Sequence, residues 1–121
     1  MKHSPAFLRL VEQARQHVHT CSAAQVKTKL ERGDRFHLVD VREDHEFAQG
    51  HAKGARHLGK GIIERDIETA VPDHQAEIVL YCGGGYRSVL AAEALGRMGY
   101  TNVWSMEGGI TAWREAGYPM E

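Results

Sequence analysis

Length, composition and charge restrict the chain to one domain and disfavour several classes of function. Its 121 residues, 42% of them hydrophobic, are enough to bury a single core. Fifteen basic and sixteen acidic side chains give a formal net charge of −1, which argues against a nucleic-acid-binding or polybasic membrane-binding role. We expect neither a signal peptide nor a membrane span, because no apolar run of the required length occurs. With two cysteines and an adequate core, a disulfide is not needed, so we expect a reducing, cytoplasmic compartment.

The first predicted element is an amphipathic helix that begins at Ser4 and Pro5, a helix cap and a first-turn proline. Apolar residues follow at helical spacing: Phe7, Leu10, Val11, Ala14 and Val18. We expect this helix to cover the flank of the domain, with a partner-binding helix as the alternative. The chain is therefore divided into an amino-terminal helical extension, residues 1–19, and a domain, residues 20–121.

Three candidate metal ligands follow this helix at every second position. They are His17, His19 and Cys21. At the end of a helix such spacing does not bring side chains together, and no second ligand cluster is evident, so we predict no metal site.

The rest of the chain alternates short apolar runs with helical patterns. Strands are predicted over 36–41, 56–58, 78–81 and 103–106. Helices are predicted from the Ser22 cap to residue 30 and over 43–48, 62–71, 88–98 and 110–116. This alternation predicts an α/β fold with a mostly parallel sheet covered by helices on both faces.

Cys82 stands where the strand over 78–81 gives way to the helix over 88–98. Three glycines follow it, and without Cβ atoms their backbone is free to turn its N–H groups inward as an anion-binding nest. Arg87 and the start of a helix add positive charge, and no acidic residue occurs between Glu77 and Glu93. These features favour the thiolate of Cys82, which is a nucleophile at neutral pH. The alternative is a free cysteine packed at the end of a strand.

Four motifs, in this order and spacing, make residues 22–119 resemble a single-domain rhodanese. They are Asp40, Val41 and Arg42 followed by Glu46; the run from Gly50 to Ala55; the loop from Cys82 to Arg87 with Ser88; and the run from Gly108 to Trp113. Each motif alone is weak, and the amino-terminal helix lies outside the family's core pattern.

The resemblance implies a thiosulfate sulfurtransferase, and we expect no cofactor and no metal because the sequence carries no metal, nucleotide or flavin signature. In this family a cysteine takes the outer sulfur of a donor such as thiosulfate as a persulfide and passes it to an acceptor such as cyanide or a thiol. Carried over here, Cys82 is the nucleophile and Arg87 is similar to the family's anion-binding arginine. The amides that would cradle the persulfide belong to Gly83, Gly84, Gly85, Tyr86, Arg87 and Ser88.

Further residues receive supporting roles. Asp40 and Arg42 resemble the family's structural pair, with Arg42 bridging to Glu46; direct substrate contact is the alternative to this packing role. Because three glycines leave the loop without side chains, donor specificity must come from elsewhere. The candidates are Tyr86 at the entrance and the cations Arg56, Lys60 and Arg65, for which an ordinary solvated surface is the alternative.

Other functions stay open beside this one. Related phosphatases and arsenate reductases place five residues between the cysteine and the arginine, whereas this chain has four, and Tyr81 stands where those phosphatases have a histidine. A persulfide relay served by a partner protein, docked on the amino-terminal helix, is the other alternative. Cys21 is either an inert thiol or a resolving thiol for Cys82. The hypothesis requires the sulfur of Cys82 to face the loop amides and to be reachable from solvent.

Overall fold

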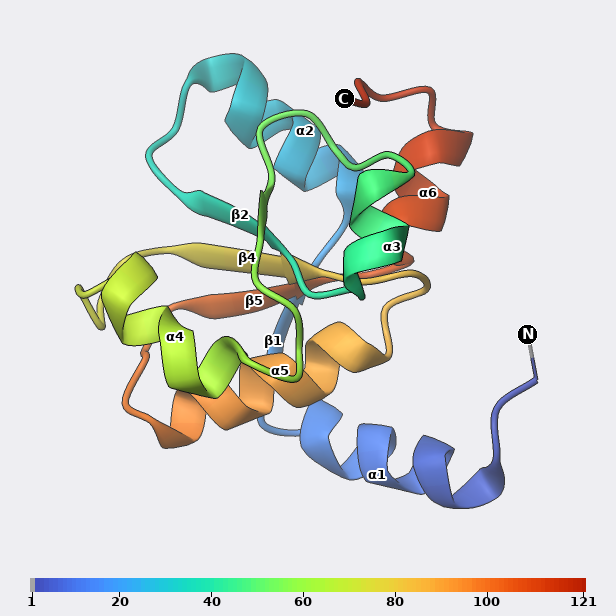
Figure 1. Ribbon diagram of the computed structural model, residues 1–121, viewed down its shortest axis with the longest axis vertical. Helices are drawn as coiled ribbons and strands as arrows, with labels where there is room; N and C mark the ends of the chain where they lie inside the picture. The colour runs from blue at the N-terminus through green and yellow to red at the C-terminus, as the bar shows by residue number, and fades with distance from the viewer. Residues whose placement is uncertain (1) are drawn as a thin grey trace.

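A parallel five-stranded sheet forms the centre of the computed structural model, which describes residues 2–121 (Figure 1). The strands are β1 (His19–Cys21), β2 (His37–Asp40), β3 (Arg56–His57), β4 (Ile78–Tyr81) and β5 (Val103–Met106), in the order β1-β5-β4-β2-β3. The helices are α1 (Pro5–Arg15), α2 (Ala23–Arg32), α3 (Asp44–Ala48), α4 (Ile63–Ala70), α5 (Arg87–Arg97) and α6 (Gly109–Glu115). The α/β fold predicted from the alternating pattern is therefore confirmed.

Helices cover both faces of the sheet. In Figure 1, α2, α3 and α6 lie on one side, and α4, α5 and α1 lie on the other. The α2 and α6 side is filled by Trp113, Tyr81 and Met106, which are fully buried. On the other side, Ile63 and Leu95 pack into a separate cluster. Within residues 2–121, no helix has the length and apolarity that crossing a membrane requires.

Strand β1 was not predicted, and the expected helix end at this place is wrong. His19 and Cys21 pair in parallel with Trp104 and Met106 of β5, at the edge of the sheet. Three residues are too few to show the period of two that marks a strand, and the pairing depends on a partner distant in sequence. Residue 19, assigned to the extension, therefore belongs to the sheet.

Helix α1 packs on α5, which begins immediately after the cysteine loop. Ser4 caps α1 by accepting a hydrogen bond from the Phe7 amide at 3.3 Å. Val11 and Ala14 of α1 form a small buried cluster with Val89 of α5. The amino-terminal segment is thereby held next to the carboxyl end of β4.

Strands β2 and β4 are neighbours, so their carboxyl ends lie together. The register pairs Asp40 with Tyr81, and a buried ion pair joins Asp40 to Arg42 at 2.8 Å. Arg42 also donates to the Gly50 carbonyl at 2.8 Å, and the hydroxyl of Tyr81 accepts from the Ala52 amide at 3.0 Å. These contacts tie the chain after β2 to the strand that carries the cysteine.

Replacing Arg42 by methionine should be strongly destabilising, because it leaves Asp40 as a buried charge without its partner. We expect the free energy of unfolding in urea to fall by about 3–5 kcal/mol. Arg65→Met is the matched control, since the Arg65–Asp66 pair is exposed and its loss should change the free energy of unfolding far less. Equal losses in the two variants would contradict the packing role of the Asp40–Arg42 pair.

Candidate active site

The loop between β4 and α5 wraps around the sulfur of Cys82. The amides of Gly85 and Ser88 donate to Sγ at 3.2 and 3.4 Å. Gly85 has φ +99°, a conformation that favours glycine, and a Cβ there would also approach the Gly108 amide nitrogen at 3.1 Å. The side chain of Cys82 therefore faces backbone N–H groups, as the hypothesis requires.

The first turn of α6 holds the outer side of this loop. The amides of Ile110 and Thr111 donate to the carbonyls of Cys82 and Gly83 at 2.8 and 3.2 Å, and the Thr111 hydroxyl adds a bond to Gly83 at 3.0 Å. A Cβ on Gly109 would collide with the Cys82 carbonyl oxygen. Gly108 and Gly109, the cap and the first residue of α6, thus let the helix approach the loop closely.

Two buried hydroxyls extend from the sulfur into the sheet. Oγ of Ser88 lies 3.5 Å from Sγ of Cys82 and 2.7 Å from Oγ of Ser105 on β5, and both serines are at most 1% exposed. Sequence reasoning missed Ser105. Its only signal was a hydroxyl in an otherwise buried strand.

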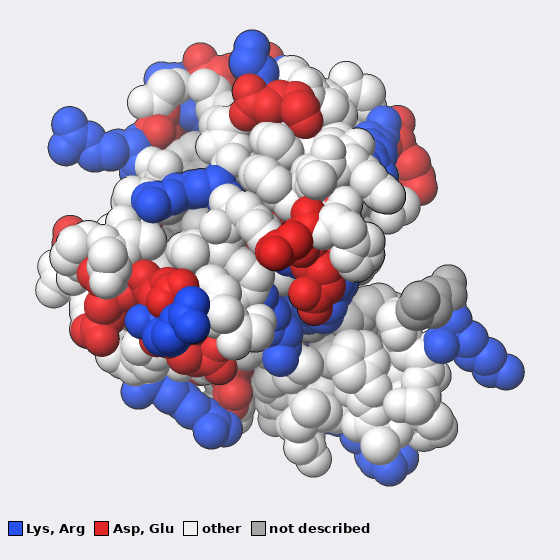
Figure 2. Space-filling view, viewed as in Figure 1, with Lys and Arg blue, Asp and Glu red and all other residues white. Residues whose placement is uncertain are grey.

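Cys82 retains only 1% exposure, yet it lines a cavity of about 790 Å³. Cys82 is therefore almost fully enclosed, and access of solvent to its sulfur stays a prediction, with this cavity as the side from which a donor would approach. The walls are Lys2, His3, Ser4, Phe7, Glu46, Gly83, Gly84, Tyr86, Arg87 and Thr111. Figure 2 shows the surface hollowed between α3, where acidic side chains gather, and α1.

Glu46 pairs with Arg87, and the predicted bridge from Arg42 to Glu46 is wrong. Two short contacts of 2.8 and 3.1 Å join the guanidinium of Arg87 to the carboxylate of Glu46, whereas Arg42 is engaged by Asp40. The hydrogen bonds from Arg87 lower the pKa of Glu46 to about 2, and those with Glu46 raise the pKa of Arg87. The bridge was misassigned because Glu46 lies four positions from Arg42 in sequence, while the fold brings Arg87 to it across the sheet edge.

The cations proposed for donor binding lie outside the set of residues that line this cavity. Arg65 pairs with Asp66, Arg56 donates to the Ala70 carbonyl at 3.3 Å, and Lys60 is exposed. Residues of the amino-terminal segment, among them His3 and Phe7, line the cavity instead. Sequence reasoning missed them because the contact joins segments about eighty positions apart, and the one local signal was His3 and Phe7 one helical turn apart.

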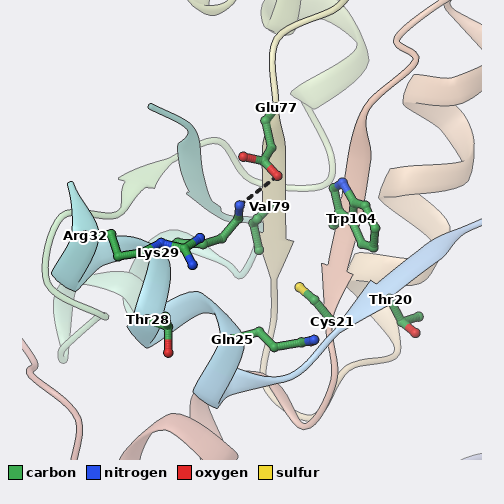
Figure 3. A pocket seen from close by; sticks show the side chains of 9 residues that line it. All are labelled: Thr20, Cys21, Gln25, Thr28, Lys29, Arg32, Glu77, Val79 and Trp104. Carbon is green, nitrogen blue, oxygen red and sulfur yellow. Dashed lines mark ion pairs between the residues drawn. The ribbon is translucent and has the colours of Figure 1, made fainter. Parts of the chain in front are cut away.

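Cys21 lines a different, smaller cavity of about 360 Å³ that shares no residue with the first (Figure 3). There Lys29 forms an ion pair with Glu77 at 2.9 Å. Burial raises the pKa of Cys21 to about 11, so this thiol is protonated and weakly nucleophilic at neutral pH. The geometry favours the inert thiol over the resolving thiol. Among residues 2–121, no three side chains of ligating type converge on a metal position.

Replacing Glu46 by glutamine should remove a pH-dependent part of the stability. The pKa of Glu46 is lowered by folding, so its ionised form stabilises the protein above its ordinary value of 4.5, and this contribution disappears as the pH falls toward about 2. We expect wild type and Glu46→Gln to differ most near neutral pH and to converge in acid, as measured by urea unfolding across this range. Glu93→Gln, which breaks an exposed pair with Arg97, should show a small difference throughout. A wild-type advantage of unchanged size in acid would contradict the role of the Glu46–Arg87 pair.

Comparison with known proteins agrees with this architecture. The family described as Rhodanese-like domain matches residues 22–116. The thiosulfate sulfurtransferases GlpE of Stutzerimonas stutzeri and Pseudomonas putida are 37% and 39% identical, over 69% of this chain and 74% of each relative. A solved structure from Rhodopseudomonas palustris, described as a protein of unknown function and possible tyrosine phosphatase, is 28% identical with a TM-score of 0.89, covering 100% of this chain and 98% of that one. The chain belongs to the rhodanese-like domain family.

Proposed function

We propose that the chain is a rhodanese-type sulfurtransferase that carries a sulfane sulfur on Cys82. Family membership and relatives named thiosulfate sulfurtransferase support the class of activity. The observation that carries the proposal is that Sγ of Cys82 lies within 3.2 and 3.4 Å of two inward-facing amides, in a residue that lines a cavity. Donated N–H groups and the start of α5 stabilise negative charge at this place.

In the first proposed step, the Cys82 thiolate attacks the outer sulfur of thiosulfate. The S–S bond of the donor breaks, sulfite leaves with its electron pair, and the terminal sulfur of the new persulfide carries the negative charge. In the second step, cyanide or a thiolate attacks that terminal sulfur and the Cys82 thiolate is released. The loop amides serve both steps because the charge stays on sulfur throughout.

The residues in and around the loop have distinct roles in this proposal. Gly83, Gly84, Gly85, Tyr86, Arg87 and Ser88 supply the backbone that surrounds the stored sulfur. Arg87, held by Glu46, fixes the shape of the loop before α5. Asp40 and Arg42 support the strand ends from the core, a packing role favoured by their burial.

Two alternatives have distinct consequences. Four residues separate Cys82 from Arg87, one fewer than in the related phosphatases and arsenate reductases, and the amides of Gly85 and Ser88 donate to Sγ itself. A loop of this length favours binding of a single sulfur atom over binding of a phosphate or arsenate. A relay would take its persulfide from a partner protein instead of a small donor. Both cysteines are free thiols, which supports a reducing, cytoplasmic setting for either sulfur-handling role.

Replacing Cys82 by serine should abolish sulfur transfer while leaving the fold intact. Wild type exposed to thiosulfate should gain one sulfur atom on Cys82 by mass spectrometry and form thiocyanate when cyanide is added. Cys21→Ser is the matched control and should behave as wild type. Transfer that survives in Cys82→Ser would overturn the proposal. Persulfide that appears only with a protein donor would replace the enzyme with the relay, and hydrolysis of an aryl phosphate without sulfur uptake would favour a phosphatase.

A further inference from the structure

We propose that the cavity before Cys82 selects sulfur donors that carry an apolar organic group and one negative charge, such as aryl thiosulfonates, over the thiosulfate dianion. The amino-terminal segment supplies the binding surface for the organic group. This inference rests on the proposed sulfur transfer and names its substrate class.

The cavity is much larger than the sulfur-binding ring at its wall. Its volume of about 790 Å³ falls in the range of sites for whole small molecules and far exceeds the one sulfur atom that the proposed transfer adds to Sγ. The space beyond the ring is bounded by Phe7 and His3 as well as by the loop. A donor that fills it must extend beyond the transferred sulfur.

An aromatic wall begins at the loop itself. The ring of Tyr86 lies 4.6 Å from that of His3 and 6.3 Å from that of Phe7, and His3 and Phe7 are 5.3 Å apart, all in tilted arrangements. These three side chains are partly exposed and line the cavity. Tilted aromatic rings at such distances form a surface on which an apolar or aromatic group packs favourably.

The wall is held in place by regular structure. Phe7 lies in the first turn of α1, whose Ser4 cap binds the Phe7 amide, and Val11 and Ala14 anchor the helix on α5. Tyr86 directly precedes α5. Both sides of the wall are therefore fixed to the same helix that starts at the sulfur-binding loop.

The charges around the cavity favour a monoanion. Arg87 is the cation nearest the loop, but Glu46 on the same cavity wall is ionised at neutral pH and compensates it through two short contacts. Lys2 is exposed, so solvent screens it. The loop amides suit the one charge that resides on sulfur. A second charge, as on thiosulfate, gives up hydration on entering the cavity, and the lining cation that has no carboxylate partner among residues 2–121, Lys2, is exposed to solvent.

The chemistry with such a donor balances without another reactant. The Cys82 thiolate attacks the outer sulfur of the thiosulfonate, the bond between that sulfur and the sulfonyl sulfur breaks, and its electron pair leaves on the sulfinate. Two single negative charges enter the step, and two leave it, on the persulfide and on the sulfinate. The apolar substituent stays on the departing sulfinate, away from the ring.

The test compares donors in the wild type and in Phe7→Ala, with cyanide as acceptor. We measure kcat/KM for benzenethiosulfonate, methanethiosulfonate and thiosulfate. Loss of the Phe7 ring should lower kcat/KM for benzenethiosulfonate about tenfold, with a change below about twofold for the other two. Leu10→Ala, a truncation at a 53% exposed position of the same helix, should change none of the three. Because kcat/KM for each donor is compared between wild type and variant, the intrinsic reactivity of that donor cancels from the ratio.

A second measurement needs no variant. Benzenesulfonate, which cannot donate sulfur, should inhibit the wild type at concentrations about tenfold lower than methanesulfonate. Equal inhibition by the two sulfonates, or equal losses for all donors in Phe7→Ala, would overturn the inference while transfer from thiosulfate upheld the proposed function. Absence of sulfur uptake from every donor would overturn both.

Discussion

The hydrogen bonds from the start of α6 to the carbonyls of Cys82 and Gly83 are the constraint on which the site depends. In a trans peptide the C=O and the following N–H point in opposite directions. Because α6 holds these two carbonyls on the outer side of the loop, the N–H groups of Gly83 and Gly84 point away from α6. The glycine at 109 permits that approach. A helix more than twenty residues further along the chain thus sets the direction of the peptides next to Cys82, whose sulfur accepts from the amides of Gly85 and Ser88.

The local sequence pattern was enough to predict four of the five strands and the position of the cysteine. It did not predict contacts between segments that are distant in sequence. The strands over 78–81 and 103–106 match the structure because apolar runs between glycine and polar residues mark buried strands. The placement of Cys82 at a strand-to-helix junction follows from the same pattern. β1, the partner of Glu46 and the lining of the cavity by His3 and Phe7 were missed, because each depends on segments that meet only after folding.

Two ion pairs, one in the core and one at the cavity wall, neutralise the two arginines near the site. Arg42 and Asp40 neutralise each other inside the core, and Arg87 and Glu46 do so at the cavity wall. With both arginines paired to carboxylates, the groups that contact the sulfur directly are the amides of Gly85 and Ser88 and the Ser88 hydroxyl. Backbone dipoles are fixed in direction, so they stabilise charge only at the point on which they converge.

The near-complete enclosure of Cys82 also bears on how the chain withstands oxidants. A cysteine at 1% exposure presents almost no surface to molecules that collide at random, and the cavity that it lines is the side from which a reagent would approach. Oxidation of a thiolate beyond the sulfenic acid adds oxygen atoms irreversibly, and each needs room next to the sulfur. On the side of Gly85 and Ser88 the loop amides already contact the sulfur, at 3.2 and 3.4 Å. The enclosure that places the thiol among backbone amides therefore also limits the approach of bulky oxidants to it.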